Sequence, residues 1–215
     1  MSILLGSFLQ AWNMLLYNAM YELVRDAGVP ALPPTLVIAL AFPLIDLGYY
    51  WFHRLSHEVQ IMWIGHGVHH SGFAYNLSTA LRQGTGEKVT APFFYMHLAA
   101  LQLPPSVYQT AKAWHTVYQF WPHTDFLAGN LPAAVEFVFN TPAHHRVHHA
   151  RNARYLRKNF AGMFVLWDRL HGTFMAEHPD DPCVFDQPAL YDSFNPLWEQ
   201  VAHTKDIAAD VAKHR

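Results

Sequence analysis

Three closely spaced groups of histidines constrain this chain more than any other feature of its sequence. The first group has the pattern H-x-x-x-H, and the second and third both have the pattern H-x-x-H-H. On a helix, residues i, i+3 and i+4 share one face, so each group can direct its imidazoles to one point. Imidazole is a ligand of iron, zinc, copper and nickel. We therefore predict a metal site formed by His53 and His57, by His66, His69 and His70, and by His145, His148 and His149.

The number of candidate ligands indicates more than one metal ion. A structural zinc ion takes four ligands and a catalytic one leaves a position open, so eight imidazoles suit two ions. Few carboxylates lie among them, which separates the site from the Glu-x-x-His carboxylate bundles. His144 also lies four residues before His148, but the H-x-V-H-H pattern shared by 66–70 and 145–149 favours His145. The position of His123, after an apolar segment, leaves a ligand role and a packing role equally open.

An acidic residue continues the face of the first histidine group. Asp46, Tyr50, His53 and His57 follow spacings of 4, 3 and 4 and so share a helix face. Asp46 is the single acid in the apolar run 35–52. A carboxylate that accepts the second ring N–H of a ligand histidine is common around metal sites. We predict this role for Asp46; the alternative is a carboxylate solvated at a membrane interface.

Apolar runs predict an all-α integral membrane protein with about three to four membrane helices. The run 35–52 has 18 residues and no basic one, close to the roughly 20 that span a bilayer. The runs 89–103 and 106–121, separated by two prolines, favour a hairpin that enters the membrane and returns. Residues 3–24 either span it or lie in its interface. The mean hydropathy of +0.02 is modest, so a soluble helical protein with a large core is the alternative.

The chain has no domain linker, so we interpret residues 1–215 as a single domain with a motif core at 46–174 and a tail at 175–215. A net charge of −2 argues against a protein that binds nucleic acid by neutralising phosphates. A single cysteine excludes a disulfide scaffold. Cytoplasmic segments of membrane proteins are rich in Lys and Arg. The chain is predicted to lie in a bacterial inner membrane or its equivalent, with the histidine site facing the cytoplasm. The reason is a cluster of six basic residues near the third histidine group: Arg146, Arg151, Arg154, Arg157, Lys158 and Arg169.

The motif core resembles the fatty acid hydroxylase/sterol desaturase superfamily of membrane di-iron enzymes. The resemblance rests on the ordered histidine series and on the stretches 46–54 and 167–174. Glu58 and the stretch 75–83 are similar to the alkylglycerol monooxygenase-like branch. The resemblance implies two non-haem irons, O2 activation and hydroxylation of a C–H bond in a lipid or sterol-like substrate. Because no flavin or nicotinamide fingerprint is present, electrons would come from an external donor, such as a ferredoxin- or cytochrome-type reductase chain.

The same resemblance assigns further site residues. His123 matches an additional family histidine and becomes a ninth expected ligand. Glu58, Asn76 and Asp168, together with Asp46, would act beside the metals or the substrate. Two other functions remain open. One is a desaturase or a C–C or C–O cleaving oxidase on the same scaffold. The other is a zinc-dependent membrane hydrolase with Glu58 as general base.

Overall fold

The structure is a computed structural model that describes residues 2–72, 74–129, 131–185 and 195–213. Within these residues the chain is helical and contains no β-strand, which confirms the predicted helical class. The expected tail at 175–215 is only partly covered, since 186–194, 214 and 215 lie outside the described residues. The α-helices are α1 Ser2–Asp26, α2 Pro34–Glu58, α3 Gln60–His66, α4 Glu87–Thr90, α5 Met96–Ala100, α6 Pro105–Tyr118, α7 Ala133–Val138, α8 Pro142–His149, α9 Leu166–His171 and α10 Pro196–Lys213. The 3₁₀ helices are η1 Thr79–Leu81, η2 Ala91–Tyr95 and η3 Ala153–Tyr155.

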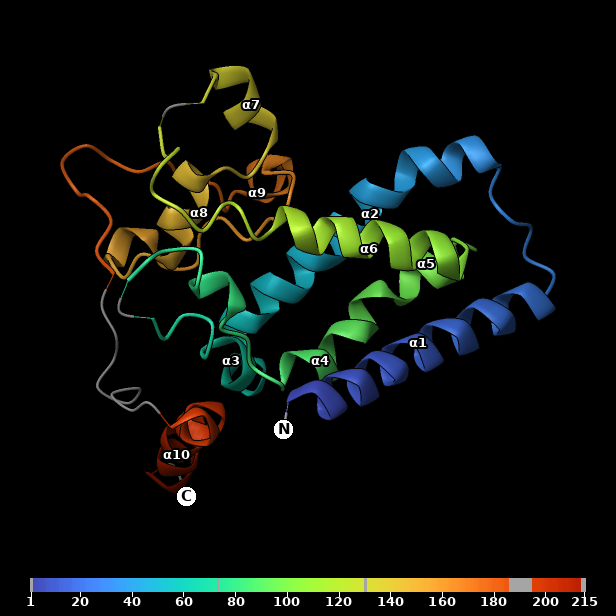
Figure 1. Cartoon of the computed structure of the whole chain (residues 1–215), viewed down its shortest axis with the longest axis horizontal. Helices are drawn as coiled ribbons and strands as arrows, with labels where there is room; N and C mark the ends of the chain where they lie inside the picture. The colour runs from blue at the N-terminus through green and yellow to red at the C-terminus, as the bar shows by residue number, and fades with distance from the viewer. Residues whose placement is uncertain (1, 73, 130, 186–194, 214–215) are drawn as a thin grey trace.

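One half of the molecule is an apolar helical layer. In Figure 1, α1, α5, α6 and the first part of α2 occupy the right-hand side. Their shared core includes Ile45 and Leu98, both fully buried. Tyr17 of α1 stacks on Tyr108 of α6, with ring centroids 4.0 Å apart, and donates its hydroxyl hydrogen to the carbonyl of Leu103 at 2.9 Å. These contacts hold α1 against the hairpin formed by α5 and α6.

Only one helix among the described residues, α2, is long and apolar enough to cross a bilayer. The expected three to four membrane helices are not confirmed. The run 89–103 folds into short pieces, α4, η2 and α5, instead of one helix. Helix α6 has 14 residues, about 21 Å at 1.5 Å per residue, which is shorter than the roughly 30 Å hydrocarbon layer. Helix α1 is long enough, but polar and charged residues interrupt its apolar surface.

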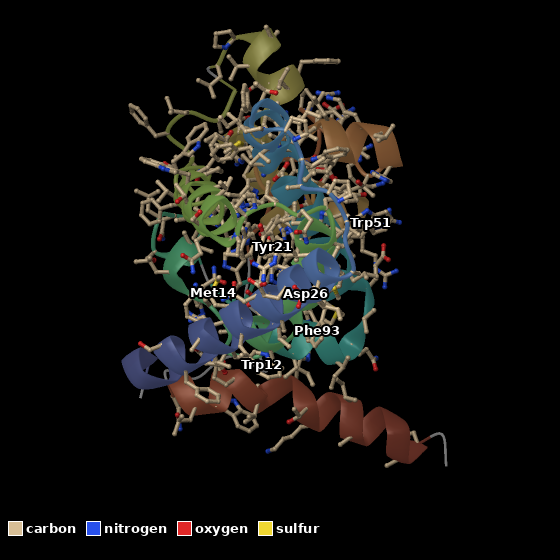
Figure 2. The ribbon with its side chains drawn as sticks, turned by 90° about the vertical axis from the view of Figure 1, so that its right-hand side faces the viewer. Trp12, Met14, Tyr21, Asp26, Trp51 and Phe93 are labelled. Atoms are coloured by element: carbon tan, nitrogen blue, oxygen red, sulfur yellow. The ribbon has the colours of Figure 1, made fainter. Side chains whose placement is uncertain are left out.

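The other half gathers the histidine-bearing segments. The second part of α2 enters it from the apolar half and meets α3, α8 and α9 on the left of Figure 1. Helix α10 lies at the lower end of the molecule in Figures 1 and 2. It packs against α3, and Glu199 of α10 pairs with Arg82. Helix α2 connects the two halves, because its first part belongs to the apolar layer and its second part carries His53 and His57.

Candidate metal centre

The nine predicted ligand histidines lie in two compact groups. Within each group, the ring nitrogens that face one another all lie within 4.8 Å. Every one of these side chains is buried or half-buried. The five-histidine group consists of His53, His57, His66, His70 and His148, and the four-histidine group consists of His69, His123, His145 and His149. The structure thus brings together residues from α2, α3, α8 and two connecting segments.

The second and third sequence clusters each divide between the two groups. His66 and His70, at i and i+4, enter the five-histidine group, whereas His69 enters the other. In the third cluster the i, i+4 pair enters the four-histidine group, and the middle histidine, His148, enters the five-histidine group. The expectation that each cluster converges on one point is therefore wrong for these two. Successive helical residues are about 100° apart, so positions i+3 and i+4 diverge enough to serve two neighbouring sites.

The register of the third cluster follows the prediction, because His145 and not His144 belongs to a histidine group. Helix α8 begins after Thr141, and His144 occupies its third position. The ring of His144 turns back toward this end of the helix, where its Nδ1 lies 3.2 Å from the carbonyl of Phe139. A histidine used at a helix start is not available to the neighbouring site.

Hydrogen bonds fix the protonation pattern of several rings. Nδ1 of His69 faces the carbonyl of Arg82 at 3.2 Å, and Nδ1 of His123 faces the carbonyl of Gln119 at 3.0 Å. A carbonyl only accepts, so both Nδ1 atoms carry the ring hydrogen. Burial lowers the pKa of His69 well below its usual value and that of His123 to about 4, so both rings are neutral at pH 7. Their Nε2 atoms therefore present bare lone pairs.

These lone pairs point at one another. The Nε2 atoms of His69 and His123 are 3.2 Å apart, and those of His53 and His66 are 3.0 Å apart. Nδ1 of His53 and of His66 also face acceptors, so the second pair has the same arrangement. Two facing lone pairs repel each other unless a cation lies between them. One such pair in each group supports one metal ion in each group.

The nitrogen–nitrogen distances also bear on the coordination geometry. Six pairs of Nε2 atoms in the two groups are 2.9 to 3.2 Å apart, and all the ligand nitrogens of a group lie within 4.8 Å of one another. With metal–nitrogen bonds of about 2.1 Å, ligands at right angles lie about 3.0 Å apart and tetrahedral ligands about 3.4 Å apart. Distances of this size allow the nitrogens of each group to bind one common ion. Iron bound by imidazoles is compatible with this donor set.

Asp168 positions His53 through the backbone. Its carboxylate is fully buried and accepts hydrogen bonds from the N–H of Phe160 at 2.7 Å, the N–H of Ala161 at 2.8 Å and the hydroxyl of Thr173 at 2.7 Å. The carbonyl of Phe160 in turn accepts the Nδ1–H of His53 at 2.7 Å. Burial raises the pKa of Asp168 to about 6, although the three donors oppose this shift. Asp168 therefore does not contact His53 itself but fixes Phe160, whose carbonyl binds His53.

Asp46 is buried as expected, but its partner is not one of the nine gathered histidines. Its carboxylate accepts the N–H groups of Met163 and Phe164, both at 2.7 Å, and the Nε2–H of His115 at 2.7 Å. His115 lies on α6, outside both groups. Between these anchors a Cβ on Gly162 would lie 2.7 Å from the His115 ring, so the backbone approaches the pair closely. The carboxylate thus ties α2 to α6 and to the 160–164 segment.

A chain of hydrogen bonds leads from this carboxylate toward the four-histidine group. His115 gives its Nε2–H to Asp46, so its Nδ1 accepts the amide N–H of Gln119 at 2.6 Å. The backbone carbonyl of Gln119 accepts the Nδ1–H of His123 at 3.0 Å. His115 is not among the residues singled out from the sequence. Its contact with Asp46, 69 positions away, depends on how α6 packs against α2.

Two of the expected site residues lie away from the histidines. Glu58 forms an ion pair with Arg54 at 2.9 Å, and the Arg54 guanidinium lies over the ring of Trp51. These three residues share the outward face of α2, and Figure 2 shows Trp51 on the outside of the molecule. Asn76 is exposed, and its side-chain oxygen accepts the backbone N–H of Ser78 at 2.9 Å. Glu58 and Asn76 therefore do not reach the gathered rings.

Glu87 contacts the site but was not predicted from the sequence. Its Oε1 accepts the Nδ1–H of His66 at 2.6 Å. The contact depends on a close backbone approach, because a Cβ on Gly84 would lie 1.9 Å from the carbonyl oxygen of Gly65. The paired glycines around 65 and 84–86 were the available signal. Their proximity in space could not be inferred from the sequence alone.

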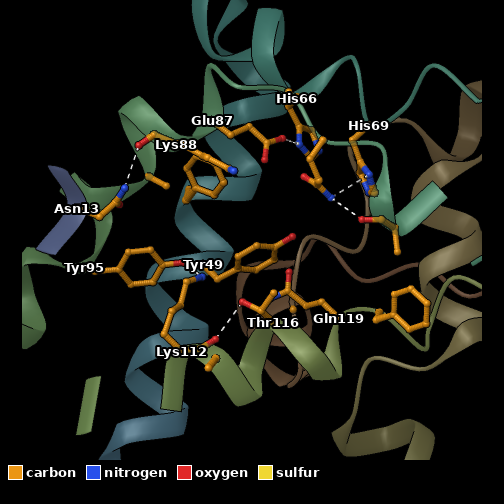
Figure 3. A pocket seen from close by; sticks show the side chains of 18 of the residues that line it. Asn13, Tyr49, His66, His69, Glu87, Lys88, Tyr95, Lys112, Thr116 and Gln119 are labelled. Carbon is orange, nitrogen blue, oxygen red and sulfur yellow. Dashed lines mark hydrogen bonds and ion pairs between the residues drawn. The ribbon is translucent and has the colours of Figure 1, made fainter. Parts of the chain in front are cut away.

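A cavity of about 660 Å³ opens onto the histidines. His66 from the five-histidine group and His69, His123 and His145 from the four-histidine group line it. Figure 3 shows His66 and His69 on one side, with Tyr49 and Lys112 across from them. The remaining wall comes from α1, α2, α4, η2 and α6 and from the segments that connect the helices. Such a volume lies within the range of ligand-binding sites of roughly 300 to 1,000 Å³.

The sequence of this chain is similar to those of several known proteins. Alkylglycerol monooxygenase from Homo sapiens is 47% identical over 167 residues, which cover 78% of this chain and 36% of that protein. Ornithine lipid hydroxylase from Rhizobium tropici is 28% identical over 145 residues, 66% of this chain and 43% of that protein. Delta(7)-sterol 5(6)-desaturase from Gibberella zeae is 25% identical over 172 residues, 77% of this chain and 50% of that protein.

This chain spans about a third of the length of the alkylglycerol monooxygenases that it matches. No solved structure shows significant similarity to it. The model of the fatty acid hydroxylase family matches residues 38–173, a stretch that contains all nine gathered histidines. The chain therefore belongs to the fatty acid hydroxylase family.

Proposed function

We propose that this protein is a membrane di-iron oxygenase that hydroxylates a C–H bond of a lipid, using O2 and electrons from an external donor. The observation that carries the proposal is the pair of buried histidine groups beside one cavity of about 660 Å³. The relatives named above support the substrate class, since their names refer to lipids and a sterol. The exact substrate and the donor, for which a ferredoxin- or cytochrome-type reductase chain is the candidate, belong to the proposal.

The proposal assigns a role to each part of the site. The five-histidine group and the four-histidine group would each hold one iron, and the irons would supply the oxidation of an unactivated carbon by O2. Glu87, Asp168 and the carbonyl of Phe160 keep His53 and His66 in the tautomer that presents Nε2 to the metal. The aromatic rings of Tyr49 and Phe52 in the cavity wall help exclude water from the reacting carbon.

A zinc hydrolase is the less favoured function. It would need a general base beside an open metal position. Glu58, the candidate base, is on the outward face of α2 and is paired with Arg54.

A desaturase on the same scaffold stays the second candidate because of the similarity to a sterol desaturase. Both reactions begin with removal of hydrogen from a carbon, and the same histidine groups would serve either. Mass spectrometry of lipids from cells with and without the protein separates them. Gain of one oxygen atom in a lipid class indicates hydroxylation, and loss of two hydrogen atoms indicates desaturation.

The five-histidine and four-histidine groups together are called the histidine centre. We further propose that α2 crosses the membrane and that the histidine centre faces the cytoplasm. The length and apolar composition of α2 support the first part, and the basic residues between 146 and 169 support the second. Labelling of single cysteines placed on either side of α2 in intact and permeabilised cells tests both parts.

Metal analysis with paired histidine variants tests the di-iron site. We expect about two irons per chain in the purified protein, as the donor set predicts. His145→Ala should lose iron from the four-histidine group, whereas His144→Ala changes the neighbouring residue of the same helix and should keep both irons. About one zinc and no iron per chain, or full iron in the His145 variant, would contradict the proposal.

A further inference from the structure

The cavity beside the histidines contains a cationic side chain that the proposed reaction does not use. Lys112 of α6 lines the wall opposite His66 and His69 (Figure 3). Its ammonium donates to the hydroxyl oxygen of Tyr95 at 2.6 Å. It also lies 4.4 Å from the ring centroid of Tyr95 and 5.5 Å from that of Tyr49. The two tyrosines hold the ammonium in place at the cavity wall.

No described carboxylate contacts this ammonium, although Asp46 and Glu87 lie near enough to favour its charge. Among the residues that the structure describes, no acidic oxygen lies within 4.0 Å of its Nζ. The nearby acids have other partners, since Glu87 binds His66 and Asp46 binds His115. Burial lowers the pKa of Lys112 to about 8, so it still carries its charge at pH 7. An ammonium has three N–H donors, and the Tyr95 hydroxyl takes one of them.

The location of Lys112 connects it to the substrate. Gln109, Lys112 and Thr116 follow helical spacings of 3 and 4 and form a polar stripe of α6 along the cavity. The same cavity is lined by histidines from both groups. A molecule that fills the cavity can therefore contact the ammonium at one wall and the histidine groups at the other. A half-buried cation without a contacting carboxylate favours a ligand that carries an anionic group.

We propose that Lys112 is a specificity-determining residue that binds the anionic oxygens of a lipid head group, a phosphate or a carboxylate. The inference rests on the proposed function, because it assumes that the cavity receives the lipid substrate. Lys112 would hold the head group inside the cavity and so select anionic lipids over neutral ones with the same chain. Tyr95 would orient the ammonium without contacting the head group.

Binding without turnover tests this proposal. The purified, metal-loaded protein in a neutral detergent is titrated with dodecyl phosphate, dodecanoate and dodecanol, which share one alkyl chain, and the Kd of each is measured at pH 7 without reductant. We expect at least one anionic compound to bind about tenfold more tightly than dodecanol, the strength of one good charge-assisted hydrogen bond. The stronger of the two anions then identifies the head group as a phosphate or a carboxylate.

Three variants complete the test. Lys112→Met should abolish the preference for anions, and Lys112→Arg should retain most of it. Lys88→Met is the matched control, because Lys88 lines the same cavity but is exposed, and it should retain the preference. Iron content of each variant reports whether the site is intact. Equal binding of dodecanol and both anions by the unaltered protein, or an unchanged preference in the Lys112→Met variant with intact iron, overturns the proposal.

Failure of the proposed function has a different signature. A protein that prefers the anionic compounds but oxidises no lipid when O2 and electrons are supplied would refute the oxygenase and leave the head-group site standing. Oxidation of lipids without any preference among head groups would refute the head-group site and leave the oxygenase standing.

Discussion

The apolar helical layer and the histidine centre are stabilised in different ways, although α2 runs through both. In the apolar layer, residues such as Ile45 and Leu98 are buried among side chains from α1, α5 and α6. Burial of apolar surface has no directional requirement, so similar side chains could replace one another there. In the histidine centre, rings such as His53 and His123 are each fixed by a hydrogen bond from Nδ1 to a specific acceptor. Replacement there would leave a polar group without its partner.

The comparison shows that one helix can serve two kinds of core. The first part of α2 contributes Val37, Ala41 and Ile45 to the apolar layer. The second part contributes Asp46, His53 and other polar groups that need partners on α6 and on the 160–164 segment. The apolar layer holds α6 against α2, and this packing is what delivers His115 to Asp46. The histidine centre therefore depends on the apolar layer, while the reverse dependence should be weak.

Removal of the metal should produce the largest difference between the two halves. Metal at about 1,000 times its Kd stabilises a folded protein by about 4 kcal/mol, and all of this would be lost from the histidine centre. Hydrogen exchange measured before and after chelation should accelerate in 53–70 and 142–149 and change little in α1 and α5. Equal acceleration in both halves would show that the centre and the layer unfold as one unit.

Leu98→Ala should have the next largest effect on stability. Leu98 is fully buried, and truncation of a buried leucine costs about 3 kcal/mol in the free energy of unfolding. Because the folded variant still packs α6 against α2, its iron content should stay at the original value. Denaturant titration measures the first quantity and metal analysis the second. Loss of iron at low denaturant would indicate tighter coupling between the halves than the contacts suggest.

Replacement of the two buried carboxylates, Asp46 and Asp168, should affect iron binding to different extents. Asp46→Asn removes an acceptor that serves α6 and the 160–164 segment, and should cost about 2 kcal/mol. It should weaken iron binding in both groups, since its contacts lead toward His123 and toward His53. Asp168→Asn acts through Phe160 on His53 and should weaken the five-histidine group alone. Iron bound per chain is measured at a series of free iron concentrations, and identical curves for the two variants would contradict this division.

Glu87→Gln should have the smallest effect. The amide oxygen can still accept from Nδ1 of His66, but without the negative charge that strengthens this contact. Loss of such a supporting interaction typically lowers metal affinity about tenfold. The same titration with iron detects this change. Gly84→Ala offers a geometric check, because its Cβ would separate the backbones that place Glu87 beside His66 and should weaken iron binding at least as much.

The sequence by itself predicted the nine histidines that the structure gathers into two groups. The spacing of the histidines along α2 and α8 is local, and helical periodicity places the i and i+4 members of each cluster on one face. The choice of His145 over His144 also followed from a local repeat, and the apolar run at 35–52 correctly indicated a long helix.

Only the tertiary structure decided how these residues are divided and supported. The split of the second and third clusters between two groups, the pairing of Asp46 with His115 and the contact of Glu87 with His66 all join residues through packing of separate segments. Glu58 follows directly after His57, yet it lies on the outward face of α2. Local periodicity fixes the direction of a side chain around its own helix. The identity of the segment that it meets depends on contacts between distant parts of the chain, which no local pattern encodes.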